Sequence, residues 1–87
     1  MATVWIPPLM SDLTNGQERV VVAGEKVRDL IEGLEARHPG LKARLLEDGE
    51  LRRGLVLTVD GIASRQGLRH RVLPDSEINF VPAIGGG

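Results

Sequence analysis

The stretch VRDLIEGL, residues 27–34, decides the fold, because it carries the clearest helical pattern in the chain. Its apolar residues recur at spacings of three and four, which places them on one stripe of an amphipathic helix. Pro39 disfavours a helical conformation at His38, so we expect the helix to end there. A shorter helical turn is expected to follow over residues 41–46. The stripe consists of Val27, Leu30, Ile31 and Leu34.

Runs of β-branched and apolar residues flank this helix on both sides. Residues 2–6 and 19–23 come before it, and an Asn-Gly turn signal between them predicts a hairpin. Residues 55–59 follow it as the strongest strand pattern in the chain and end at Asp60-Gly61, a pair favoured in type I′ turns. Residues 77–82 form the last predicted strand. We also expect a short edge strand around residues 68–72.

This order of elements predicts an α+β fold in which one main helix lies on one face of a mixed sheet of four to five strands. The opposite face of the sheet is then open to solvent or to a partner. The predicted architecture is a roll of the β-grasp (ubiquitin-like) type. We expect one β-grasp domain over residues 1–82 and a flexible C-terminal tail over residues 83–87 that ends in Gly-Gly.

The composition excludes several classes of function. Eleven Lys and Arg against twelve Asp and Glu leave a net charge of −1, which argues against a nucleic-acid partner. We see no apolar run of about 20 residues and no signal peptide, so we expect no membrane partner and a cytoplasmic location. The chain has no cysteine and only His38 and His70, without a hydrolase or nucleotide-binding motif. We therefore expect no metal site, no bound cofactor and no enzyme activity of its own.

The C-terminal residues Gly85-Gly86-Gly87 are the one feature that composition does not explain. A glycine tail can be without function, but it can also thread a narrow channel in another protein, because it has no side chains. Residues 83–87 reach about 17 Å when extended. A terminal carboxylate is ionised at neutral pH and is a poor electrophile. It needs activation, most simply as an acyl-adenylate that a partner enzyme makes with ATP.

Three segments of the sequence resemble the ubiquitin-like bacterial sulfur carriers. They are HPGL at residues 38–41, VLTVDG at residues 56–61 and DSEINFVPAIGGG at residues 75–87. This family includes the small subunit of molybdopterin synthase, the thiamine-pathway carrier and the carrier of thiocarboxylate-dependent cysteine synthesis. The chain departs from the family in having Asp60 where asparagine is usual and Gly85 where alanine is common.

The resemblance implies that the carboxylate of Gly87 is adenylated by a ubiquitin-activating-like adenylyltransferase that uses ATP, and is then converted to a thiocarboxylate. Gly86 and Gly85 match the residues that pass through the partner's channel. A sulfur-accepting biosynthetic enzyme then takes the sulfur. The residues Pro82-Ala83-Ile84 are more similar to the molybdopterin and cysteine carriers than to the thiamine carrier.

Two other functions remain open. The chain could be a ubiquitin-like protein modifier that is conjugated to a target through Gly87, since conjugation begins with the same adenylate. It could also be a non-catalytic β-grasp binding module in which the tail has no role.

The alternation of strand residues predicts a docking surface on the open face of the sheet. If Val4 and Ile6 face the helix, Trp5 faces outward together with Val56 and Val81, and an exposed tryptophan is a frequent anchor of interfaces. The alternatives are that Trp5 packs under a loop or that the strand parity is reversed. Arg53 and Arg71 are predicted as charged contacts at the rim. The predicted core comprises Val27, Leu30, Ile31, Leu34, Leu55, Leu57, Ile78 and Phe80.

Overall fold

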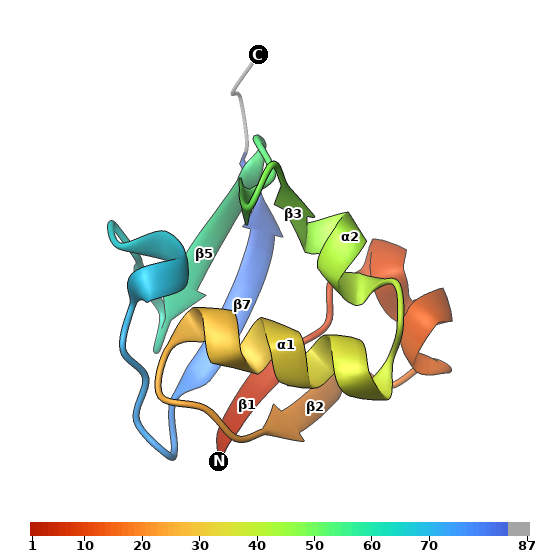
Figure 1. The fold of residues 1–87 in the computed structure, drawn as a ribbon, viewed down its shortest axis with the longest axis horizontal. Helices are drawn as coiled ribbons and strands as arrows, with labels where there is room; N and C mark the ends of the chain where they lie inside the picture. Colours follow the sequence, from red (N-terminus) through yellow and green to blue (C-terminus); the bar gives the residue numbers. More distant parts are fainter. Residues whose placement is uncertain (84–87) are drawn as a thin grey trace.

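Five strands form one mixed sheet, and the main helix crosses one of its faces (Figure 1). The computed structural model describes residues 1–83 of the 87-residue chain. The strand order is β2-β1-β7-β5-β6, with β1 and β7 parallel and the other neighbours antiparallel. The elements are β1 (Ala2–Trp5), the 3-10 helix η1 (Pro8–Thr14), β2 (Arg19–Val22), α1 (Val27–Arg37), α2 (Leu41–Leu45), β3 (Leu46–Glu47), β4 (Glu50–Leu51), β5 (Leu55–Val59), β6 (Ile62–Ala63), the 3-10 helix η2 (Gly67–Arg69) and β7 (Glu77–Pro82).

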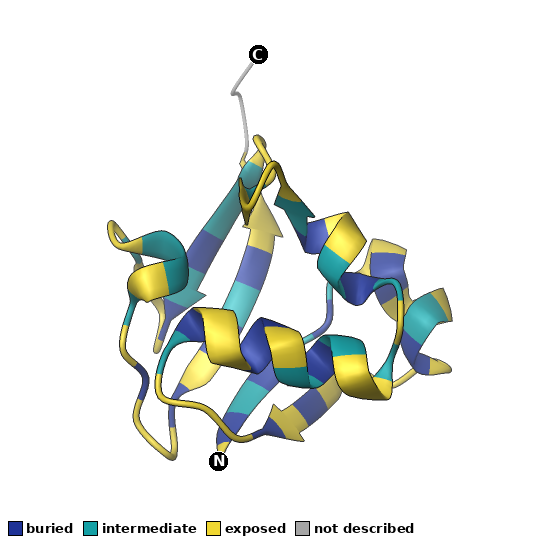
Figure 2. Ribbon diagram, in the orientation of Figure 1, coloured by how far each residue is buried: buried dark blue, intermediate teal, exposed yellow. Residues whose placement is uncertain are grey.

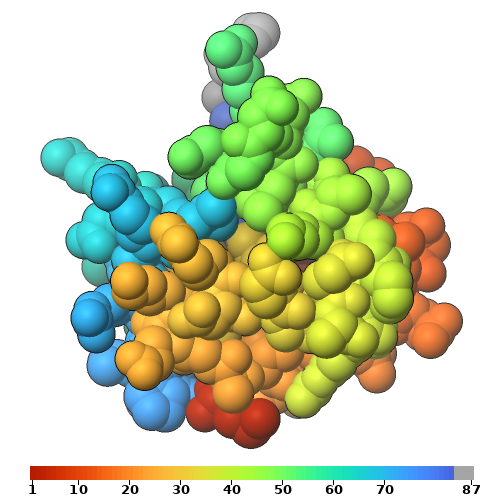
Figure 3. Space-filling view, viewed as in Figure 1, coloured from red at the N-terminus to blue at the C-terminus, as the bar shows by residue number. Residues whose placement is uncertain are grey.

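This architecture confirms the predicted α+β β-grasp roll with one main helix on one face of a mixed sheet. In the space-filling view, α1 and the segments beside it cover the sheet on the helix side (Figure 3). The open face of the sheet is therefore the opposite one. Among residues 1–83, no helix has the length and apolar character needed to cross a bilayer.

The hydrophobic core lies between α1 and the sheet, and buried positions alternate with more exposed ones along the strands (Figure 2). Every residue of the predicted core is buried except Leu55, which is partly buried at the start of β5. Between residues 1 and 83 the buried apolar residues are Ala2, Val4, Ile6, Met10, Val20, Val22, Val27, Leu30, Ile31, Leu34, Leu41, Leu45, Leu57, Val59, Val72, Ile78 and Phe80.

The predicted strand parity is confirmed. Val4 and Ile78 are paired residues of β1 and β7, and both are completely buried. On the other face, Val81 is 39% exposed, and Trp5 and Val56 are half-buried. The alternative of a reversed parity is therefore excluded.

Polar side chains fix both ends of α1. At its start, the Asp29 carboxylate accepts a hydrogen bond from the Lys26 N–H at 3.1 Å, which satisfies a donor that the helix leaves free. At its end, the Glu35 carboxylate accepts one from the Gly40 N–H at 3.1 Å. Gly40 has a φ of 107°, a conformation that favours glycine, so the chain can turn sharply from α1 into α2.

The prediction of an edge strand around residues 68–72 is wrong. Residues 67–69 form the 3-10 helix η2, and the edge strand is β6, directly after the Asp60-Gly61 turn. Both turn residues have positive φ, at 52° and 85°, as a type I′ turn requires. This turn reverses the chain at once, so residues 62–63 pair with the end of β5 before the chain leaves the sheet.

The small hairpin of β3 and β4 was not predicted. Its strands have two residues each and are joined by Asp48 and Gly49, both with positive φ. A strand of two residues is too short to show an alternating pattern, so the sequence carries no strand signal here.

We expect Leu57→Ala and Phe80→Ala each to lower the free energy of unfolding by roughly 3–5 kcal/mol, because each leaves a cavity in the core. These residues are direct partners across β5 and β7, 2% and 4% exposed. Urea denaturation measures the loss, and Val81→Ala on the outer face of β7 is the control, with a loss below about 1 kcal/mol. A core variant that loses as little as the control contradicts the packing described here.

Candidate functional site

The exit of the C-terminal segment is fixed by the last pair of strands. Pro82 at the end of β7 lies opposite Leu55, and the Ala83 N–H donates a hydrogen bond to the Gly54 carbonyl at 2.7 Å. The chain therefore leaves the sheet beside the loop that joins β4 to β5 (Figure 1). The predicted tail residues Gly85, Gly86 and Gly87 lie outside the described residues, as does most of the tail segment 83–87.

Arg53 lies at this exit, directly before Gly54, and is exposed. Its neighbour Arg52 donates hydrogen bonds to the Ala43 carbonyl at 3.3 and 3.0 Å, which ties that side chain to α2. Arg53 has no hydrogen bond or ion pair to any residue between 1 and 83.

Trp5 lies on the open face and is held by two polar neighbours. Its indole Nε1–H donates a hydrogen bond to the Glu77 carboxylate at 2.9 Å, and the Arg19 guanidinium carbon lies 5.7 Å from the ring centroid. The second contact is a cation–π arrangement. The ring is thereby kept against the sheet, which explains why Trp5 is half-buried rather than exposed.

The predicted apolar surface is only partly assembled. Val56 and Val81 are direct cross-strand partners, so the structure brings these two side chains together. Trp5 instead lies opposite Asn79, which precedes Val81 by two residues on β7. Trp5 is therefore a diagonal neighbour of Val81 and does not lie beside Val56.

Arg71 is not part of this surface. It forms an isolated bridge with Lys26, and the following residue, Val72, donates its N–H to the Glu25 carbonyl at 2.9 Å. These contacts place Arg71 in the segment that packs against the start of α1. Of the predicted rim contacts, only Arg53 lies where the C-terminal segment leaves the sheet.

A pair formed by Ser64 and His70 was not singled out from the sequence. The Ser64 Oγ lies 2.7 Å from His70 Nδ1 and accepts hydrogen bonds from the N–H groups of Gln66 and Gly67, each at 3.1 Å. A hydroxyl oxygen that accepts two N–H groups is committed to holding this turn together. The spacing of six residues has no pattern by which it could have been recognised.

The described part of the chain offers no metal centre. Between residues 1 and 83, no three His, Asp or Glu side chains are grouped so that they could hold an ion. Every buried side-chain nitrogen or oxygen in that range has a hydrogen-bond partner. The candidate functional site is therefore the exit of the C-terminal segment and not the interior of the domain.

Comparison with known proteins gives one consistent answer. The model of the ThiS family matches residues 10–87. The sulfur carrier protein CysO of Mycobacterium tuberculosis is 29% identical over 90 residues, which cover 98% of this chain and 97% of that protein. A chain of the crystal structure of the Amycolatopsis orientalis BexX/CysO complex superposes with a TM-score of 0.91 at 32% identity, with 100% of both chains covered.

A more distant likeness leads to an archaeal protein. The crystal structure of SAMP1 from Haloferax volcanii has a TM-score of 0.73 and 26% identity, with 99% of this chain and 98% of that chain covered. The curated relatives are named as sulfur carriers, and these are small carriers rather than catalysts. The present protein is accordingly a carrier and not an enzyme, as its sequence predicted. The family match extends over most of the chain and as far as Gly87, so the chain belongs to the ThiS family of ubiquitin-like sulfur carriers.

Proposed function

We propose that this protein carries sulfur as a thiocarboxylate on Gly87 and delivers it to cysteine biosynthesis. The observation that carries the proposal is the exit geometry: the hydrogen bond from Ala83 to Gly54 ends the ladder at the rim of the sheet, four residues before Gly87. Those residues are long enough to reach about 13 Å beyond the rim. The family match through Gly87 and the relatives named CysO support the assignment.

The chemistry of a carboxylate determines the order of steps. An oxygen of the Gly87 carboxylate attacks the α-phosphate of ATP on an adenylyltransferase partner, and pyrophosphate leaves. The acyl-adenylate is a good electrophile, so a sulfur donor displaces AMP and leaves a thiocarboxylate. A sulfur-accepting biosynthetic enzyme then receives the sulfur, and water hydrolyses the remaining acyl group, which restores the carboxylate. In this scheme ATP binds to the partner, and the carrier itself needs no bound cofactor.

Recognition requires more than the glycines. Ordering each glycine costs about 1–2 kcal/mol of backbone entropy, so binding of the tail alone is weak. We propose that Val56, Val81 and Arg53 supply docking contacts beside the exit, with Trp5 as a further contact on the same face. The Amycolatopsis orientalis BexX/CysO complex gives support by similarity, because it joins a CysO to another protein.

Protein modification is the second candidate. The archaeal neighbours from Haloferax volcanii and Methanosarcina acetivorans are named SAMP1, which stands for small archaeal modifier protein 1. Modification and sulfur transfer both begin with adenylation of the terminal glycine. The intact mass of the protein purified from cells separates them: exchange of one oxygen for sulfur gives a small defined increase, whereas conjugation gives a series of larger species.

Transfer to molybdopterin or thiamine synthesis is a further alternative for the sulfur acceptor. Reconstitution with the thiocarboxylated protein tests it directly. The proposal expects sulfur to appear in a cysteine product with the cognate synthase, and it fails if only a molybdopterin or thiamine synthase accepts the sulfur.

We expect deletion of Gly86 and Gly87, or addition of one residue after Gly87, to abolish adenylation. The first variant shortens the tail, so its terminal carboxylate no longer reaches the adenylyltransferase's active site. The second variant moves the terminal carboxylate to a different residue. Pyrophosphate release with the cognate adenylyltransferase measures the reaction. The melting temperature is the control and should be unchanged, because the deleted and added residues lie beyond β7. Full sulfur transfer by either variant contradicts the proposal.

We expect Trp5→Ala and Val81→Ala each to raise KM for the carrier in that assay by about fivefold to tenfold while kcat changes less, because each removes apolar area from the docking surface. Leu9→Ala is the matched control: Leu9 is 85% exposed on η1, outside that surface. Equal KM values for all three variants would place the docking surface elsewhere. Thermal melts show whether Trp5→Ala leaves the domain folded.

A further inference from the structure

β2 lies at one edge of the five-stranded sheet and pairs only with β1 within the described chain. The Ile6 N–H donates to the Glu18 carbonyl at 2.9 Å, and this bond sets the pattern of the ladder. In an antiparallel pair, hydrogen-bonded positions alternate with positions whose backbone groups point away from the partner strand. Arg19 and Val21 occupy the latter positions, so their N–H and C=O groups point to the free edge.

One of these edge groups is already engaged. Arg37, at the end of α1, donates from Nη1 to the Val21 carbonyl at 2.8 Å. Within residues 1–83, the N–H groups of Arg19 and Val21 and the Arg19 carbonyl have no hydrogen-bond partner. The free edge thus keeps two donors and one acceptor in the spacing of a β-ladder.

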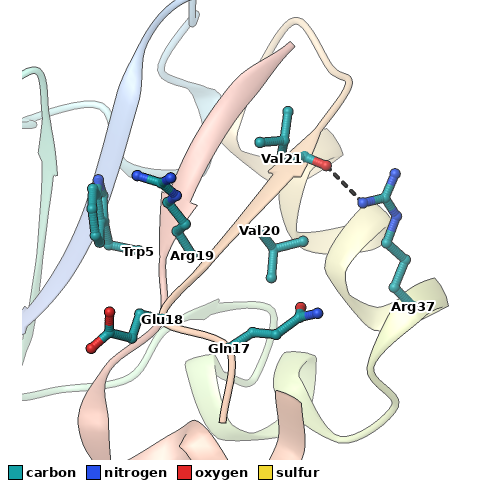
Figure 4. A pocket seen from close by; sticks show the side chains of 7 residues that line it. All are labelled: Trp5, Gln17, Glu18, Arg19, Val20, Val21 and Arg37. Carbon is teal, nitrogen blue, oxygen red and sulfur yellow. Dashed lines mark hydrogen bonds between the residues drawn. The ribbon is translucent and has the colours of Figure 1, made fainter. Parts of the chain in front are cut away.

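An open hollow of about 580 Å³ follows this edge. Figure 4 shows Trp5 and Arg19 on one side of β2 and Arg37 reaching toward Val21 from the other. The side chains of Arg19 and Val21 face outward on the strand, and Val21 is 42% exposed. The surface therefore combines a strand edge, an exposed apolar side chain and an arginine on either side.

We infer that the β2 edge binds an extended acidic segment of a partner protein by strand addition. An added strand pairs with the free backbone groups of Arg19 and Val21, which supplies affinity independent of sequence. Its side chains alternate between the two faces, so some approach Arg19 and others approach Arg37. Carboxylates at these positions match both guanidinium groups, and among the described residues that line the hollow Glu18 is the only acidic one.

On strand addition, Arg37 exchanges its hydrogen bond to the Val21 carbonyl for an ion pair with the partner segment. When the incoming strand binds, its N–H replaces the guanidinium at the Val21 carbonyl, so no backbone acceptor is left unpaired. The released guanidinium then pairs with an acidic side chain of the segment. Without such a segment, the same arginine covers the edge, which is a common protection against unspecific strand pairing.

The charge of the surface also decides against a second copy of this chain as the occupant. Antiparallel pairing of two β2 strands would bring Arg19 and Arg37 of both copies to one narrow edge. Like charges that face each other are unfavourable, and an acidic segment has the opposite effect. β6, at the other edge of the sheet, has only two residues and offers no comparable ladder.

The probe is a short peptide in which valine and glutamate alternate, compared with the same peptide carrying lysine in place of glutamate. Trp5 is the only tryptophan and lines the hollow, so its fluorescence reports binding. Amide hydrogen exchange gives a second readout. In the free protein we expect the amides of Arg19 and Val21 to exchange fast and those of Val20 and Val22 to exchange slowly, and we expect the acidic peptide to protect the first pair.

We expect Val21→Pro to weaken binding of the acidic peptide by about tenfold, because it removes a donor of the free edge. Proline is tolerated at an edge position whose N–H faces solvent, and Val21→Thr, which keeps the N–H, is the matched control. We expect Arg19→Glu to weaken binding by about fivefold or more. Arg65→Glu changes the net charge equally but lies outside the lining, and it should bind normally.

Several results would overturn the inference. They are equal binding of the acidic and basic peptides, no protection of the Arg19 and Val21 amides, or a Val21-dependent dimer of the protein in sedimentation. If Val21→Pro fails to fold, the exchange data on the unmodified protein and the comparison of Arg19→Glu with Arg65→Glu still decide. Deletion of Gly86 and Gly87 should leave peptide binding unchanged, which separates this surface from the sulfur chemistry.

Discussion

The parallel pairing of β1 with β7 is the constraint on which the rest of the structure depends. It joins the first strand of the chain to the last, and its centre is the fully buried pair Val4 and Ile78. Because β7 is held at the centre of the sheet, its end is fixed at the rim beside Gly54. The same pairing leaves β2 at the edge. The exit of the tail and the free edge are thus two consequences of one contact between distant parts of the chain, a type of contact that forms only after a large loss of chain entropy.

Because α1 covers only one face of the sheet, the helix-covered face and the open face have different roles. The helix side completes the core with Leu30, Ile31 and Leu34, each at most 1% exposed. The open face needs no such packing, so its residues are free to serve binding. There, Trp5 is kept against the sheet by Glu77 and Arg19, and this arrangement covers part of an aromatic ring that would otherwise be an exposed apolar group.

Local patterns predicted most of the elements, and distant contacts account for what they missed. The stripe of α1 and the alternation in β5 and β7 were sufficient to place these elements and to identify seven of the seventeen buried apolar residues of the described chain. The register of β1 on β7 has no local signal, so the position of Trp5 relative to Val56 was not predictable. The Arg37 contact with Val21 depends on how α1 crosses the sheet. The glycine tail was visible in the sequence, but its chemistry came from the resemblance to a family.

In the proposed function the carrier meets two enzymes one after the other, and the geometry is compatible with both encounters in one small domain. Two enzymes that both accept the C-terminal segment would compete for the same exit, because each would approach Pro82 and Arg53. On this proposal they bind in turn. β2 is separated from β7 by β1, so a segment paired with its edge does not occupy that exit. Pro82 and Arg53 do not line the β2 hollow, so the binding energies at the exit and at the β2 edge are close to additive. A partner that engages both the β2 edge and the tail exit thus gains affinity over one that engages the exit alone, and this difference can decide which enzyme the loaded carrier meets next.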